Sequence, residues 1–524
     1  MLAATSLLLV ACGPLHGGTP PEGALILRAG TIHTMDASGS VAQAMVVVDG
    51  EIVYVGDDAG TAAYESPSAT IVELGGQAVL PGFHDAHTHL LWSGTDLLDV
   101  DLFSVTTVDE LTAAVRAWAE QRPEAPWVRG GGWGAADFEG LLHRSQLDAV
   151  VPDRPVLLYS ADYHSAFVNG AALELAGITA ATPDPPDGVI ERDDAGEPTG
   201  VLREDAAALV ADLAPLQPEA QVDEGLANAQ REANGLGITT IVDASVEDWM
   251  LAGYARAEAT GALTLRVHAA VAIDTSAAGE VERIAALREQ YTSEHLAIDS
   301  AKLFIDGIIE SQTATMLEPY VDGTNGTPVF TDQELQDAVV ALDAAGLQLH
   351  AHAIGDGAVR QILDALQVVV DRNGPRDRRP LLAHLEVVDP QDWPRFAALG
   401  AYADLQLLWA YPDEYIQELT WPVIGPERSE WLYPAGALYD AGATLVGGSD
   451  WSVSSMNPFE AIEVAVTRQD PWEDTGPVLT PQHALDLMTA VRAYTSAGAR
   501  ASFSEGQVGT LEAGRRADFI VVDR

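Results

Sequence analysis

Short apolar runs alternate with longer amphipathic segments between residues 81 and 502. Helical periodicity separates most of these runs, as in residues 219–237, 332–346 and 390–400, and each of these segments ends at the glycine typical of a helix C-terminus. Strands that alternate with helices predict an α/β fold, the (β/α)8 or TIM barrel. The eight runs that we interpret as its strands are FHDAHTHL, ITTIVDAS, LTLRVHAAV, AKLFIDG, LQLHAHAIG, PLLAHLEV, AYADLQLL and TLVGGSDW.

The two end segments follow a period-two pattern instead. Residues 24–80 contain three stretches in which apolar and polar residues alternate between Gly/Asp turns, a pattern typical of short strands. The final stretch, GTLEAGRRADFIVVD, has the same character. We therefore predict that residues 24–80 and 503–524 together form a small β-sandwich that flanks the barrel.

The first two predicted strands are separated by a segment too long for one crossover helix. It contains WVRGGGWGAADFEG and PVLLYSADYHSAFVNGAALELAGI, followed by a loop rich in Pro, Asp and Gly at residues 180–200. This content predicts an inserted subdomain after strand one, over about residues 95–215, within a barrel that spans residues 81–502.

The charge balance excludes several kinds of partner. The chain of 524 residues has 27 basic and 78 acidic residues, giving a net charge of −51 at pH 7. The acids are scattered rather than gathered in a tail, and such a field repels nucleic acid and anionic membrane surfaces. We therefore expect no nucleic-acid partner, and a saline or extracytoplasmic setting in which a hydrated acidic surface maintains solubility.

The first residues, MLAATSLLLVACGPLHGG, join an apolar run too short to span a bilayer to the only cysteine of the chain. Cys12 follows a small residue in LVAC, which resembles the lipobox of bacterial lipoproteins and implies cleavage before Cys12 and lipidation of its sulfur. A buried N-terminal segment is the alternative, but the Gly/Pro/His linker disfavours it. Residues 1–23 are thus predicted to be a lipoprotein signal peptide and linker that place the protein in the cell envelope, on its periplasmic or extracellular face. The lipid anchor would be its only membrane contact.

Metal-binding side chains occur at the ends of five predicted strands. Inward residues at the carboxyl ends of barrel strands converge on one mouth, where the active sites of such barrels lie. Imidazoles and a carboxylate at that mouth suit a metal such as zinc, and no thiolate is available there. In strand order, the candidates are His87 and His89, Lys302, His350 and His352, His384, and Asp450.

Lys302 stands out because it is the only lysine in the chain, in an apolar strand-like run. Lysine is normally among the commonest residues. Either a chemical requirement has retained this lysine, or an arginine-rich composition has left one by chance. Composition alone does not decide between these two explanations.

The motifs resemble the amidohydrolase superfamily, and most of all its amidohydrolase-3 branch, which includes N-substituted formamide deformylases. The resemblance extends from about residue 24 to the end of the chain. LPGFHDAHTHL and HAIGD are specific in combination. The supporting motifs are AKLFIDG, GGSDW, GGGWGAADF, YHSAFVNGAALELAGIT, GEPTGVL, PYVDG and GTLEAGRRADFIVVD.

The resemblance implies a centre of two divalent metal ions, with zinc expected and manganese, iron or nickel as alternatives. A carboxylated lysine bridges the metals, and Lys302 is at its position. An amine between two cations is driven to its neutral form, which can capture carbon dioxide, whereas arginine cannot be converted in this way. By matching motifs, one metal would be held by His87, His89 and Asp450, and the other by His352 and His384.

Three positions near these motifs need separate comment. Ala383 stands where the family usually has a glutamate, directly before the sixth-strand histidine. Alanine cannot make the supporting contact to the metal ligands that this glutamate would make. Gly357 stands where a basic residue is common. His350 is the alternative to His352 as the metal ligand from this strand. The HAIGD motif aligns His352 with the family's ligand, so His350 is assigned a supporting place behind the ligands. The other candidate pocket residues are Trp133, His164, Tyr320 and Trp409.

The resemblance implies hydrolysis of a non-peptide C–N bond in a small-molecule N-acyl or N-formyl amide. A metal-activated hydroxide would attack the carbonyl carbon, Asp450 would transfer its proton to the leaving amine, and Lys302 would act through the bridge. An ester or lactone hydrolase is one alternative. A non-catalytic surface lipoprotein that binds a metal or solute is another, disfavoured because no ligand position is lost. Whether the chain forms a homodimer stays open.

Overall fold

The computed structural model describes residues 21–134, 138, 140–161, 165–185, 188–273, 279–326, 328–473 and 475–523. Cys12 and His164 lie outside the described residues, so the lipid anchor and one candidate pocket residue stay predictions. The chain forms two compact units, one comprising Met1–His89 with Glu232–Arg524, and the other Leu90–Arg231. The second unit corresponds to the insertion that we expected over about residues 95–215.

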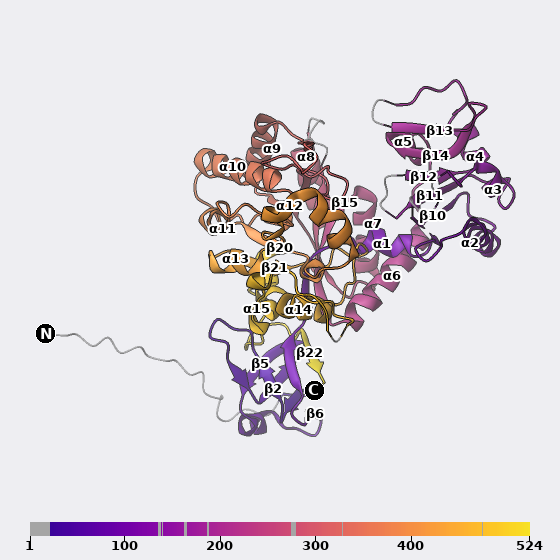
Figure 1. Ribbon diagram of the computed structural model, residues 1–524. Helices are drawn as coiled ribbons and strands as arrows, with labels where there is room; N and C mark the ends of the chain where they lie inside the picture. The colour runs from indigo at the N-terminus through magenta and orange to yellow at the C-terminus, as the bar shows by residue number, and fades with distance from the viewer. Residues whose placement is uncertain are drawn as a thin grey trace. The chain divides into compact units, whose positions relative to one another are not determined.

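Eight parallel strands form the nearly closed barrel of the first unit (Figure 1). All eight coincide with the apolar runs interpreted as strands from the sequence, so the predicted α/β barrel is confirmed. Four of them are buried along their whole length, as expected for strands that helices cover on the outside. In sheet order they are β8 (Phe83–Thr88), β15 (Ile238–Val246), β16 (Arg266–Ala272), β17 (Leu296–Phe304), β18 (Gln348–Ala353), β19 (Leu381–His384), β20 (Tyr402–Leu405) and β21 (Thr444–Gly447).

Backbone hydrogen bonds join the first and last strands just beyond their carboxyl ends. The amide of Asp450 donates to the carbonyl of His87 at 2.7 Å, and the amide of His89 donates to the carbonyl of Trp451 at 2.9 Å. This pairing brings residues from opposite ends of the barrel sequence side by side at its mouth.

The helices of this unit alternate with the strands and begin and end as the sequence predicts. A capping box between Thr331 and Glu334 starts α9, and Gly400, with φ 67°, ends α11 in the left-handed conformation that glycine tolerates. The helices are α7 (Asp248–Thr260), α8 (Glu280–Tyr291), α9 (Asp332–Ala344), α10 (Asp356–Asn373), α11 (Trp393–Leu399), α12 (Trp421–Ser429), α13 (Ala435–Asp440), α14 (Pro458–Thr467), α15 (Leu487–Ala493) and α16 (Ser496–Ala501), while α6 (Glu219–Gly235) spans the sequence boundary between the two units.

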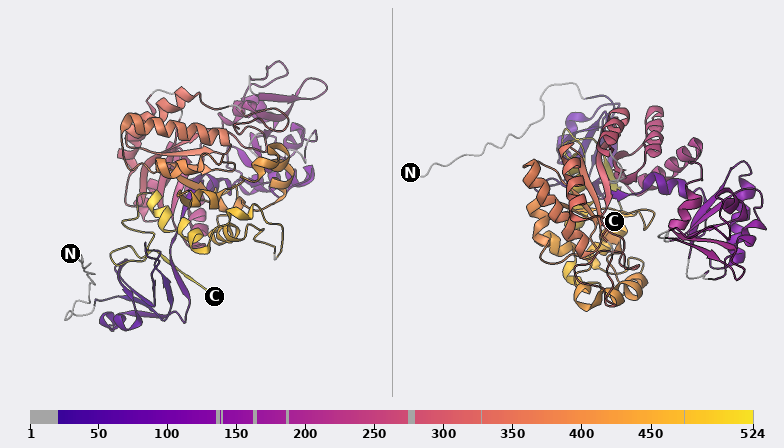
Figure 2. Two further views of the ribbon diagram at one scale, coloured as in Figure 1. Left: turned by 60° about the vertical axis from the view of Figure 1, so that its left-hand side comes forward. Right: turned by 90° about the horizontal axis from the view of Figure 1, so that it is seen from above.

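The two ends of the chain build a β-sandwich, as predicted. In Figures 1 and 2 the yellow C-terminal strand lies beside the indigo N-terminal strands, and it pairs antiparallel with β7. Asp49 and Gly50, both with positive φ, form the tight turn between β4 and β5. The two sheets are β5–β4–β1–β6 and β22–β7–β2–β3, with β1 (Leu25–Arg28), β2 (Thr31–His33), β3 (Val41–Ala42), β4 (Ala44–Val48), β5 (Glu51–Gly56), β6 (Thr70–Glu73), β7 (Ala78–Pro81) and β22 (Phe519–Val522).

The inserted unit has its own mixed sheet, in the order β13–β14–β12–β11–β10–β9, and its own apolar core. Its separate core explains why the unit can be inserted into a barrel without disturbing the strand order. Its elements are α1 (Leu90–Asp96), β9 (Val100–Asp101), α2 (Val108–Gln121), β10 (Val128–Trp133), α3 (Arg144–Asp148), β11 (Val156–Ser160), β12 (Ser165–Val168), α4 (Gly170–Leu175), β13 (Gly188–Arg192), β14 (Pro198–Glu204) and α5 (Asp205–Ala211).

Within the described part of the chain, no helix combines the length and the hydrophobicity needed to cross a bilayer.

The acidic surface predicts that salt stabilises the fold. A net charge of −51 repels itself, and the Debye length falls from about 30 Å at 0.01 M salt to about 3 Å at 1 M. Between these concentrations of NaCl we expect the melting temperature to rise by more than about 5 °C, a shift that corresponds to roughly 5 kcal/mol for a chain of this length. Differential scanning fluorimetry measures it, with sucrose of equal osmolality as the control. A melting temperature that stays constant or falls with NaCl would contradict the prediction.

Candidate metal centre

The structure brings all six predicted ligand candidates to the carboxyl ends of the barrel strands. They come from β8, β17, β18 and β19 and from the segments that follow β8 and β21. All except His89, which is partly exposed, are buried. These residues are His87, His89, Lys302, His352, His384 and Asp450.

His87, His89 and Asp450 form the first group. Asp450 Oδ1 lies 3.4 Å from His87 Nε2 and 3.1 Å from His89 Nε2. His89 Nδ1 lies 2.9 Å from the carbonyl oxygen of Ala244, which can only accept, so Nδ1 carries a proton and Nε2 is the nitrogen turned toward Asp450. These atoms are close enough together to bind one metal ion.

Lys302 lies directly beside this group. Its Nζ is 3.1 Å from His87 Nε2, the side chain is 1% exposed, and the ring of Phe304 is 5.0 Å away. Burial lowers the pKa of Lys302 to about 8, against the attraction of Asp450 and Asp404. The neutral amine is therefore far more accessible at neutral pH than in an ordinary lysine.

His352 and His384 form the second group, with ring centroids 4.5 Å apart. His352 Nε2 donates to the carbonyl of Gly307 at 3.1 Å, which leaves the Nδ1 lone pair for a metal. His384 Nδ1 lies 2.9 Å from Oε1 of Gln406, which leaves its Nε2 lone pair free. Both histidines thus have one nitrogen held by the protein and one available.

Burial sets the protonation states that metal binding needs. It lowers the pKa of His87 and His384 well below the usual value for histidine, and that of His352 to about 4, with neighbouring cationic groups adding to the effect. For Asp450, burial opposes ionisation, yet the adjacent His89, His384 and Lys302 hold its pKa below the ordinary range. Neutral imidazoles and an ionised carboxylate are the forms that bind divalent cations.

Several residues of the sequence motifs serve to hold the ligands in place. Asp85 Oδ1 accepts from the amides of His87 at 3.2 Å and Ser449 at 2.9 Å, which ties β8 to the segment after β21. A Cβ at Gly448 would lie 2.6 Å from the Cβ of His87, so only glycine allows this approach. The backbone of His384 and of Asp450 has positive φ, a strain of about 1–3 kcal/mol per residue that is typical of functional sites.

Asp306 of the FIDG motif anchors the loop after β17. Its carboxylate accepts from three backbone amides, those of Thr315 at 3.0 Å, Ile354 at 3.0 Å and Gly355 at 2.9 Å. Asp356 of HAIGD accepts in the same way from the amide of Leu317 at 2.8 Å. The acids of these two motifs therefore shape the loops that surround the centre.

Three further residues singled out from the sequence are buried. Trp133 is 2% exposed in the core of the inserted unit, where its Nε1 donates to Leu158. Tyr320 is 2% exposed, and its hydroxyl donates to Ala314. His350 is fully buried, with Nε2 2.9 Å from His87 Nδ1. The interpretation of Trp133 and Tyr320 as pocket walls is corrected, because each is enclosed by protein, whereas the contact of His350 with His87 agrees with the supporting place assigned to it from the sequence.

Trp409 is the predicted pocket residue that does lie at the centre. Its ring is parallel to that of His384, with 5.7 Å between centroids, and its Nε1 donates to Ser454. Phe304, which we did not predict, is 45% exposed and lies 5.3 Å from the ring of His352. Two aromatic side chains thus flank the second group of ligands.

Sequence reasoning also missed two buried polar residues of β20 and its end, Asp404 and Gln406. They contact His87, His350 and His384. The sequence pattern could have revealed them, because in AYADLQLL two polar residues spaced two apart interrupt an otherwise apolar strand. In a buried strand such residues need specific partners.

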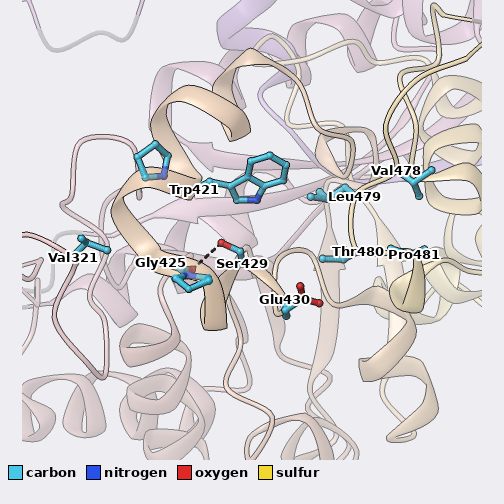
Figure 3. Close-up of a pocket in the computed structure, with 11 residues that line it drawn as sticks. Val321, Trp421, Gly425, Ser429, Glu430, Val478, Leu479, Thr480 and Pro481 are labelled. Carbon is cyan, nitrogen blue, oxygen red and sulfur yellow. Dashed lines mark hydrogen bonds between the residues drawn. The ribbon is translucent and has the colours of Figure 1, made fainter.

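A separate groove of about 680 Å³ lies beside α12 (Figure 3). Trp421, Val321 and Leu479 supply its apolar wall and Glu430 a charge, while the hydroxyl of Ser429 donates to the carbonyl of Gly425. None of its lining residues is a ligand candidate, so the groove is distinct from the metal centre.

Comparison with known proteins agrees with this geometry. The profile of the amidohydrolase family matches residues 70–524. The N-substituted formamide deformylase of Arthrobacter pascens is 30% identical over 95% of this chain and 93% of its own. Protein LONG AFTER FAR-RED 3 of Arabidopsis thaliana is 33% identical over 96% and 88%.

The fold has a solved counterpart. The crystal structure of an uncharacterized metal-dependent hydrolase from Pyrococcus furiosus superposes with a TM-score of 0.78 at 25% identity, covering 96% of this chain and 99% of that one. The family profile, full-length relatives and barrel agree with the ligand geometry at the strand ends. The chain therefore belongs to the amidohydrolase family.

Proposed function

We propose that this protein is a metal-dependent hydrolase of non-peptide C–N bonds, acting on N-acyl or N-formyl amides of small molecules. The proposal depends on one observation: six potential metal ligands lie together at the carboxyl ends of the barrel strands. They are His87, His89, Lys302, His352, His384 and Asp450. The finer choice of an amide is supported by the 30% identity to an N-substituted formamide deformylase over nearly the whole chain.

The six side chains fit two divalent cations. Nitrogen and carboxylate ligands without a thiolate suit zinc first, with manganese, iron or nickel as alternatives. Carbon dioxide would add to the neutral amine of Lys302: a bond forms between Nζ and carbon, one proton is released, and the resulting carbamate is an anion. From its place beside His87 Nε2 it would bridge the two ligand groups.

Bound metals would supply Lewis acidity and a water molecule with a pKa near about 7. The residues of the chain would transfer the proton and position the substrate. Asp450, kept ionised by its neighbours, accepts a proton and returns it to the leaving amine. Trp409 and Phe304 flank the centre and would hold the substrate against the ligands.

Activity screening of the metal-replete protein tests this function. We expect turnover of N-formyl, N-acetyl or cyclic amides, its loss after chelation, and its recovery on adding Zn²⁺. Turnover restricted to esters and lactones would replace the amide assignment. A protein that binds metal and hydrolyses none of these substrates would instead be a binding protein.

We also propose that the protein is anchored in the cell envelope by a lipid on Cys12. The natural protein should then partition into the detergent phase of a Triton X-114 separation, and a Cys12→Ser variant should stay in the aqueous phase. Recovery of the natural protein in the cytoplasm with Met1 intact would contradict the anchor.

A further inference from the structure

One barrel strand contributes none of the six predicted ligands and yet ends in two buried polar side chains. β20 carries Asp404, and Gln406 follows it two residues later, so both side chains lie on the same side of the strand. Asp404 is 0% exposed and Gln406 is 1% exposed. Burial of a carboxylate and an amide is costly unless specific partners compensate, so their contacts indicate what they do.

Gln406 fixes the orientation of His384. Its Oε1 can only accept, so the contact of 2.9 Å requires His384 Nδ1 to carry the proton and leaves Nε2 as the nitrogen with a lone pair. Trp409 lies parallel to the same ring, with 1° between the planes. The stacking fixes the plane of the ring, and the hydrogen bond fixes which nitrogen keeps a lone pair for a metal.

Asp404 lies behind His87. Its Oδ2 is 3.6 Å from His87 Nδ1 and 3.4 Å from His350 Nε2, and those two nitrogens are 2.9 Å apart. On the other side of the His87 ring, Nε2 faces Lys302 and Asp450. For Nε2 to bind a metal, Nδ1 must carry the proton; His350 Nε2 is within hydrogen-bond distance of Nδ1, and Asp404, when ionised, would further stabilise this tautomer.

We propose that Asp404 and Gln406 are positioning residues of the metal centre, one behind a ligand of each group. Asp404 orients His87 and Gln406 orients His384, so a single strand that holds no metal aligns both halves of the centre. Neither residue touches the substrate. The inference rests on the metal-dependent function proposed above, but it concerns metal affinity and is tested without a substrate.

The test measures binding of Co²⁺ and Zn²⁺ to metal-free protein. We compare Asp404→Asn, which keeps the shape and removes the charge, with Gln406→Leu, which removes the acceptor, and Gln406→Glu, which keeps it. Chelator competition gives the affinities, and the visible spectrum of bound Co²⁺ reports ligand geometry. Loss of such supporting contacts typically weakens metal binding about 10–100-fold.

Two matched variants control for the loss of a buried polar group. Gln348 is a buried glutamine on β18 whose partners are Ser300, Arg379 and Ala501, and Asp243 is a buried carboxylate on β15 that accepts from Tyr254. Gln348→Leu and Asp243→Asn should lower the melting temperature yet keep metal affinity within about threefold of the parent, the effect that a merely structural role would produce.

We expect Asp404→Asn and Gln406→Leu to weaken binding about 10–100-fold and to alter the Co²⁺ spectrum, and Gln406→Glu to restore both. Parent-like binding in Asp404→Asn and Gln406→Leu would overturn the proposal, as would an equal loss in the control variants. If Gln406→Leu does not fold, Gln406→Met takes its place.

A parent protein that binds two metals without hydrolysing amides would refute the proposed function and leave this inference standing. A parent that binds no metal would overturn both.

Discussion

Lys302→Arg and Lys302→Ala are each expected to lose at least about 1,000-fold in kcat/KM, a loss of about 4 kcal/mol in transition-state stabilisation. Arginine keeps the positive charge but cannot form a carbamate, and its pKa above about 12 keeps it charged beside the imidazole of His87. The side chain is 1% exposed, so the larger guanidinium also has no space to move away. A lysine that served only as a buried cation would tolerate arginine better than alanine.

The measurement combines elemental analysis with turnover on the same samples. The parent should bind two metals per chain, and both variants clearly fewer. Because Lys302 is the only lysine, ¹³C-labelled bicarbonate should produce one side-chain carbamate signal in the parent and none in Lys302→Arg. Formate or acetate should partly restore Lys302→Ala by supplying an anionic bridge. Near-normal rates with two metals in Lys302→Arg would mean that the lysine has been retained by chance.

His89→Ala is expected to reduce kcat/KM by at least about 1,000-fold while the fold is kept. His89 Nε2 faces Asp450 at 3.1 Å and its side chain is 17% exposed, so its removal deletes a ligand without opening a sealed cavity. Residues at the carboxyl ends of barrel strands serve function more than stability. Isothermal titration with Zn²⁺ should show that one of two binding events is lost or strongly weakened.

His87→Ala should be as inactive and also less stable. His87 is fully buried between Lys302, His350 and Asp404, and its loss leaves their polar atoms without a partner, at about 1–3 kcal/mol. His268→Ala is the matched control, because His268 lies on β16 beside Asp299 and away from the ligand candidates. An active His87→Ala, His89→Ala double variant would defeat the whole site assignment.

Periodicity alone was sufficient to predict the barrel. Each strand is a short apolar run flanked by helical segments with recognisable ends, and these features depend only on nearby residues. The candidate ligands followed from the same pattern, since residues at the carboxyl ends of parallel barrel strands must converge. The sandwich was also predictable, although its closing strand β22 lies at the opposite end of the chain from its partner β7.

Burial and pairing depend on contacts between distant segments, and only the tertiary structure decided them. Trp133 and Tyr320 are large aromatic residues of the kind that line pockets, but the packing around them places them inside protein. Asp404 and Gln406 carry no motif, and their role appears only when the barrel brings β20 close to histidines on β8, β18 and β19. The sequence by itself determined which chemistry the barrel mouth contains. The tertiary structure decided which nitrogen of each histidine is held by the protein, because that depends on an acceptor from another strand.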